Sequence, residues 1–180
     1  MKSMENSRFV TYHPEIPALP VHLQELAKTV IGNDNVSGFG DIFDNFCIYN
    51  PPKQLETWIK QYFDLGPIYK LHVRTIKNVF PPHVDSGIES VTSFLIETGG
   101  ETHTAWHTSI DNNSEIIEDH VIPKGVWHTI DVKSPHSVFN IDPDKLRIMV
   151  SVEKITPTGF DFDDYRRQAK LIAERSKTYL

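Results

Sequence analysis

The sequence has very little of several features that would assign its class at once. Its one cysteine, Cys47, can form neither an internal disulfide nor a cysteine-based zinc site. No apolar run approaches the roughly eighteen residues that a membrane-spanning helix needs. Residues 1–10 lack the apolar stretch of a secretion signal, and one cysteine suits a reducing compartment. We therefore expect a cytoplasmic protein with no membrane partner.

Positive charge is also scarce. Lys and Arg number 18 against 24 Asp and Glu, which gives a net charge of −6 over 180 residues. A protein that coats nucleic acid needs a dense basic surface, so we expect no duplex nucleic acid partner. The chain is long enough, and at 39% apolar residues hydrophobic enough, for a single domain with a substantial core.

The spacing of apolar residues changes along the chain. Helical spacing predicts amphipathic helices at 21–31, around 55–63 and at about 161–178. Between Ile68 and Glu153 the period falls to two, and turn residues such as Pro81-Pro82 divide this region into short strands. The predicted strands are 45–50, 68–76, 89–97, 102–109, 115–121, 126–132, 136–140 and 145–154. This pattern predicts a mainly β sandwich or barrel.

One predicted strand indicates where the helices pack. In 145–153, Leu146, Ile148, Val150 and Val152 alternate with more polar residues. This aliphatic face must be buried, and the three helices carry apolar stripes suited to cover it. We therefore expect α-helices packed outside one sheet, while Arg147, Met149 and Ser151 face the other way.

Histidines point to a metal site, because seven of the nine lie within residues 72–136. In extended chain His83 and Asp85 point to the same side, so they can present an imidazole and a carboxylate together. His136, on a distant strand, fits as the third ligand. Two His and one carboxylate on one face form the facial triad of non-haem Fe(II) oxygenases. His128 is the alternative third ligand, but it precedes Arg147 by too many residues for a simple hairpin.

Arg147 follows His136 by eleven residues, across the predicted turn at 142–144, so a hairpin brings the two together. A guanidinium grips a carboxylate through two parallel hydrogen bonds, as a 2-oxo acid co-substrate requires. Ser151 lies on the same face and is a candidate to add a hydroxyl. His72 and Arg74 share a face of strand 68–76 and are candidates for contact with the co-substrate or the substrate.

The order His83-x-Asp85, His136, Arg147 resembles the HxD…H…R pattern of the Fe(II)/2-oxoglutarate-dependent dioxygenase superfamily. The segment 134–152 is similar to that family's last two core strands, and the resemblance covers about residues 68–153. The family's usual Arg-x-Ser has methionine as its last residue here, which leaves Ser151 as the candidate hydroxyl.

The resemblance implies a double-stranded β-helix, the cupin-like jelly roll, at 67–155. A helical extension at 1–66 and a C-terminal helix at 156–180 would complete a single oxygenase domain. It implies Fe(II) on His83, Asp85 and His136, 2-oxoglutarate on Arg147 and Ser151, and O2 as oxidant. The expected reaction hydroxylates a small molecule or a protein side chain, with release of succinate and CO2. The alternatives are another metal-dependent cupin and a non-enzymatic jelly-roll binding module.

Overall fold

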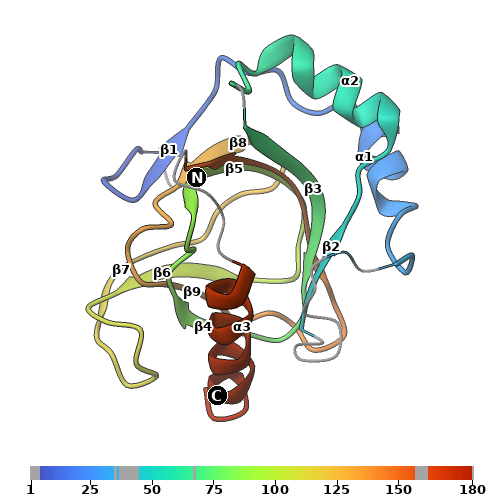
Figure 1. Cartoon of the computed structure of the whole chain (residues 1–180). Helices are drawn as coiled ribbons and strands as arrows, with labels where there is room; N and C mark the ends of the chain where they lie inside the picture. The colour runs from blue at the N-terminus through green and yellow to red at the C-terminus, as the bar shows by residue number, and fades with distance from the viewer. Residues whose placement is uncertain (1–4, 35, 37–44, 67, 157–161, 180) are drawn as a thin grey trace.

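The computed structural model of the chain describes residues 5–34, 36, 45–66, 68–156 and 162–179. Its strands form two antiparallel sheets (Figure 1). The larger sheet contains, in order, β1 (Val10–Tyr12), β8 (Trp127–Ile130), β5 (Ile88–Thr98), β10 (Arg147–Ile155), β3 (Tyr69–Ile76) and β2 (Phe46–Tyr49). The smaller sheet contains β4 (Phe80–His83), β9 (His136–Phe139), β6 (His103–His107) and β7 (Ile116–His120).

The order of the strands identifies the fold. From β3 to β10 the chain passes repeatedly between the two sheets, so that β8-β5-β10-β3 faces β4-β9-β6-β7. This is the arrangement of a jelly roll, or double-stranded β-helix. The predicted fold class is therefore confirmed. The larger sheet gains β1 and β2 at its two edges, outside the eight-stranded core.

The two N-terminal helices cover the outer face of the larger sheet. α1 (Val21–Lys28) and α2 (Lys53–Tyr62) each begin directly after a proline. Their buried residues form one apolar cluster with the outward-facing residues of the sheet. That cluster includes Leu23, Ala27, Leu55, Ile59, Leu71, Val73, Val150 and Val152. The alternation in β10 thus led correctly to a helical cover. No helix within the described ranges is long and apolar enough to cross a membrane.

The C-terminal helix, α3 (Phe162–Ser176), lies elsewhere than predicted. It packs against β4, on the side of the molecule away from α1 and α2 (Figure 1). Its buried Ala169, Ile172 and Ala173 join the cluster between the sheets rather than the cluster under the N-terminal helices. The physical reason is that α1 and α2 already fill the outer face of the larger sheet, so α3 covers the open side of the barrel.

Pro81 and Pro82 were also placed wrongly by the sequence pattern, which predicts a turn. They lie inside β4, at the edge of the smaller sheet. An edge strand tolerates proline because one side of its backbone has no neighbouring strand to hydrogen-bond. The pairing of β4 with β9 then sets His83 directly opposite His136. The residues that break the sequence pattern therefore lead into the candidate site.

Candidate metal centre

A cavity of about 100 Å³ lies between the two sheets. Its walls are mostly apolar, and α3 contributes Gln168, Ala169 and Ile172 to them. The polar side chains that line it are Arg74, His83, Asp85, Ser86, Ser93, Thr104, His128, His136, Arg147 and Gln168. The cavity therefore has a small number of polar groups on an apolar background, as a small-molecule site does.

Three of these side chains converge as the sequence predicts. One ligand atom each from His83, Asp85 and His136 lies within 4.8 Å of the other two. The His83 Nε2 and Asp85 Oδ1 atoms are 3.3 Å apart, and the two imidazole centroids are 4.2 Å apart. Two atoms bound at right angles about 2 Å from one ion lie about 3 Å apart, so His83 Nε2 and Asp85 Oδ1 have the spacing of two ligands of a divalent metal.

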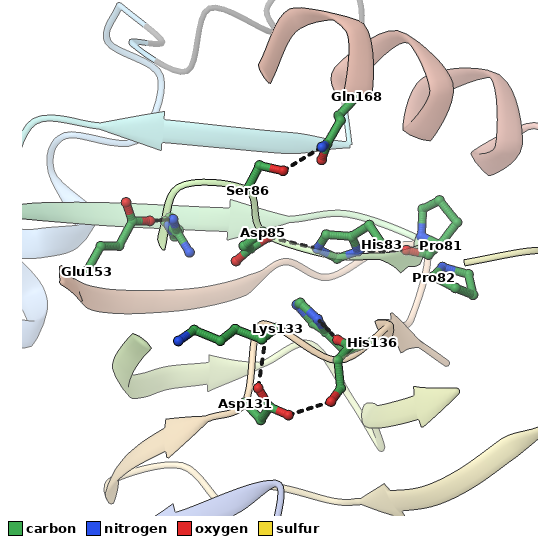
Figure 2. Close-up of polar contacts among 12 residues, drawn as sticks. Pro81, Pro82, His83, Asp85, Ser86, Asp131, Lys133, His136, Glu153 and Gln168 are labelled. Carbon is green, nitrogen blue, oxygen red and sulfur yellow. Dashed lines mark hydrogen bonds and ion pairs between the residues drawn. The ribbon is translucent and has the colours of Figure 1, made fainter. Parts of the chain in front are cut away.

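Backbone carbonyls orient both imidazoles. The Nδ1 atom of His83 donates to the Pro81 carbonyl at 2.8 Å, and that of His136 donates to the Ser134 carbonyl at 3.0 Å (Figure 2). A carbonyl only accepts, so Nδ1 carries the proton in each ring. The Nε2 lone pairs are left for a metal, which is the usual outer-sphere arrangement of a histidine ligand.

The electrostatics keep His136 and Asp85 in the forms that bind metal. Burial, together with the neighbouring His83, lowers the pKa of His136 to about 4, so the ring is neutral near pH 7. Burial alone would raise the pKa of Asp85. The neighbouring His83 and His136 rings and the Arg74 guanidinium outweigh burial and lower this pKa below its ordinary value. A neutral imidazole and an ionised carboxylate are the required ligand forms.

Arg147 begins β10 and lines the same cavity, only 3% exposed. Its Nη2 donates to the Thr104 hydroxyl at 3.1 Å, whereas its Nε and Nη1 atoms are buried and have no hydrogen-bond partner among the described residues. Burial lowers its pKa to about 10, so it stays charged at neutral pH. A buried guanidinium with free N–H groups is costly unless a ligand supplies acceptors, and a carboxylate fits it best.

A structural ion pair does not account for Arg147. Two nearby carboxylates are engaged elsewhere: Asp85 lies beside His83 (Figure 2), and Glu153 pairs with Arg74. Within the part of the chain that the structure describes, no ion pair to Arg147 is present. The guanidinium therefore faces the cavity without a counter-charge.

Ser151 and His128 occupy different places from the triad. The Ser151 hydroxyl is fully buried, bonds the Ser93 hydroxyl at 2.8 Å and is not among the described residues that line the cavity. Its contact with a co-substrate stays a prediction. His128 does line the cavity, but it does not belong to the cluster of converging ligand atoms. Burial, together with Arg147, lowers its pKa to about 3.

Sequence reasoning missed two groups of this site. Thr104, the hydroxyl partner of Arg147, lies on β6, and alternation would place it inward only once the register with Val138 on β9 were known. Gln168 of α3 donates to Ser86 at 2.5 Å, next to Asp85 (Figure 2). Nothing in the sequence indicated that α3 reaches the metal ligands.

No protein-family model matches the chain, and no curated protein is significantly similar to it in sequence. Hydroxypropylphosphonic acid epoxidase from S. wedmorenis is 16% identical with a TM-score of 0.40, over 61% of this chain and 51% of its own. AviO1 from Streptomyces viridochromogenes is 10% identical with a TM-score of 0.47, over 85% and 92%. Oxalate decarboxylase from Bacillus subtilis is 12% identical with a TM-score of 0.36, over 61% and 25%. The chain thus spans about half the length of the epoxidase.

Proposed function

We propose that this protein is a non-haem Fe(II)- and 2-oxoglutarate-dependent oxygenase that hydroxylates its substrate and releases succinate and CO2. One observation carries the proposal. A single cavity holds two imidazole Nε2 atoms and a carboxylate within 4.8 Å of one another, and it also holds a buried arginine with free N–H groups. A metal centre alone would leave that arginine unexplained.

Each side chain has a defined task in this proposal. His83, Asp85 and His136 would hold the iron on one face and leave the opposite positions open. Arg147 and Thr104 would bind the distal carboxylate of 2-oxoglutarate. Iron together with the oxo acid and O2 supplies the oxidising power of the reaction. The apolar walls and α3 would exclude water, which protects an oxidising site from side reactions.

The proposed substrate is a small molecule or a protein side chain, and we propose a cytoplasmic enzyme without a duplex nucleic acid partner. The cavity favours chemistry on a small group, because its volume is about 100 Å³. The presence of Asp85 favours hydroxylation, because a halogenase of this superfamily leaves that position for halide.

Succinate formation from 2-oxoglutarate tests the proposal. The wild-type chain with Fe(II), ascorbate and O2 should form succinate, and Asp85→Ala should abolish it while the fold stays intact. Asp144→Ala, which removes an exposed carboxylate from the turn before β10, is the matched control and should keep full activity. Metal binding without consumption of the oxo acid would favour another metal-dependent cupin. Absence of tight metal binding would favour a binding module.

A further inference from the structure

Two arginines line the cavity, and only one of them has its charge balanced by a neighbouring carboxylate. Arg147 has only the neutral Thr104 hydroxyl as a described partner. Arg74 forms an ion pair with Glu153, which is 3% exposed. His72 Nδ1 lies 4.0 Å from Glu153, but burial lowers the pKa of His72 to about 3, so this ring adds no charge near pH 7. The charge of Arg147 therefore has no described counter-charge, whereas the charge of Arg74 is balanced by Glu153.

The two arginines lie on neighbouring strands, and only Arg74 pairs with Glu153. Arg147 and Glu153 lie six residues apart on β10 and face the same way, which corresponds to about 20 Å along a strand. Arg74 lies opposite Met149 on the neighbouring β3 and pairs with Glu153. Arg74 lines the same cavity as His83, Asp85 and His136. In Figure 2, Glu153 and His83 lie on opposite sides of Asp85.

The surroundings of Arg74 are apolar and covered. Its guanidinium carbon lies 5.5 Å from the centre of the Phe46 ring, which also lines the cavity. Ile88 and Val91 on β5 and Ile172 on α3 also line the cavity. A net charge placed here would be buried without compensation, because Glu153 already neutralises Arg74. A hydrogen-bond acceptor without charge could still accept from the guanidinium.

We infer that the primary substrate is a small, electrically neutral molecule with an apolar body and one hydrogen-bond acceptor, which Arg74 orients beside the metal centre. The inference rests on the proposed function, in which Arg147 binds the anionic co-substrate.

The test uses pairs of ligands that differ only in charge. Carboxamides from propionamide to hexanamide, and the carboxylates of the same length, are titrated calorimetrically into the full chain loaded with Mn(II) and saturated with 2-oxoglutarate. The same titrations are done in Arg147→Met, in which Arg74 is the only arginine that lines the cavity among the described residues. A failure of 2-oxoglutarate to bind would contradict the proposed function, and the Arg147→Met titrations would still decide the present inference.

We expect the best amide to bind at least about tenfold more tightly than its carboxylate, near pH 7.5. Glu153→Gln leaves Arg74 uncompensated and should reverse the preference. Glu89→Gln is the matched control, because it removes a carboxylate that pairs with Lys154 at the surface of the same sheet. It should keep the wild-type preference.

A preference of the wild-type protein for carboxylates would overturn the inference. An unchanged preference in Glu153→Gln would do the same, as would a lack of binding by every amide. If Glu153→Gln does not fold, the double variant Arg74→Met, Glu153→Leu replaces the pair by apolar groups of similar size, an exchange that cores often tolerate. It should bind amides about tenfold more weakly than the wild type, and unchanged amide binding would contradict the role of Arg74.

Discussion

At the scale of the residue, the role proposed for Arg147 can be tested separately from that proposed for the metal ligands. Its buried Nε and Nη1 atoms have no hydrogen-bond partner among the described residues, so they can bind a carboxylate, whereas none of its atoms belongs to the ligand cluster. We predict that Arg147→Met lowers affinity for 2-oxoglutarate by about a hundredfold, since each hydrogen bond to a charged group is worth about 1.5–3 kcal/mol. Affinity for Mn(II) should be unchanged. Calorimetric titration of each ligand measures both.

Thr104→Val is the graded control for that prediction. It removes the hydroxyl that orients the guanidinium but keeps the charge, so the loss of 2-oxoglutarate affinity should be less than about tenfold. A collapse of metal affinity in Arg147→Met would show that the arginine is structural instead.

A second prediction at this scale concerns His128. Burial lowers the pKa of this imidazole from its ordinary value of 6.5 to about 3 in the folded protein. Between these values the unfolded chain binds more protons, so stability falls as the pH drops below about 6.5. From pH 7 to pH 5 this residue should cost about 2 kcal/mol of unfolding free energy. Urea denaturation at the two pH values measures the difference.

His128→Gln should reduce that pH-dependent loss by about 2 kcal/mol, whatever it does to stability at pH 7. His22→Gln, on the exposed side of α1, is the control and should leave the loss as in the wild type. An equal loss in His128→Gln and the wild type would mean that His128 is not buried in its neutral form.

At the scale of the element, the turn at Gly99 supports the start of β10. Gly99 has a φ of +76°, and a Cβ there would lie 3.0 Å from the Arg147 backbone nitrogen and 3.0 Å from Ile141 Cγ2. Gly99→Ala should therefore lower the free energy of unfolding by about 2–4 kcal/mol and displace Arg147. Denaturation gives the first effect, and weaker binding of 2-oxoglutarate reports the second.

Gly125→Ala is the matched control for the turn. Gly125 also has a positive φ, +83°, but nothing lies within 4 Å of the added Cβ. It should cost only the backbone strain, about 1–2 kcal/mol, and leave 2-oxoglutarate affinity unchanged. Equal effects in the two variants would show that the turn does not press on Arg147.

The sequence allowed the strands and helices to be predicted where packing follows local periodicity. The alternation of residues in β10 correctly predicted a buried aliphatic face. The apolar stripes of α1 and α2 correctly predicted that these helices cover that face. Local pattern failed where the decisive interaction is distant. Pro81 and Pro82 indicate a turn unless the chain is known to run at a sheet edge, and the stripe of α3 fits either face of the barrel.

The same division applies to the candidate site. The pattern of His83, Asp85 and His136 led to the right three side chains, and the pairing of β4 with β9 sets the two imidazoles opposite each other. The predicted hairpin between His136 and Arg147 was wrong, because β9 and β10 belong to different sheets. The contact between Arg147 and Thr104 could not be predicted, since it joins opposite sheets across the cavity. The strand pairings also have register irregularities beside Met149 and His107. At these positions the spacing of residues in the sequence does not predict which side chains lie opposite each other.

At the scale of the whole molecule, the candidate centre joins the two halves of the fold. The imidazoles come from the smaller sheet, whereas Arg147 comes from the larger one. A ligand that bridges the metal and Arg147 would therefore connect both sheets, and it would bind only the folded chain. Binding at a hundredfold excess over Kd stabilises the folded state by about 2.7 kcal/mol.

We therefore predict that Mn(II) and 2-oxoglutarate together raise the Tm by roughly 5–10 °C, since about 1 kcal/mol shifts the Tm of a chain of this size by roughly 2–4 °C. The shift should vanish in Asp85→Ala, which lacks a ligand, and survive in Asp144→Ala. Succinate with Mn(II) should give a smaller shift, because it lacks the 2-oxo group that chelates the metal. If 2-oxoglutarate raised the Tm equally with and without Mn(II), this would contradict the prediction that the metal and Arg147 bind the same 2-oxoglutarate molecule.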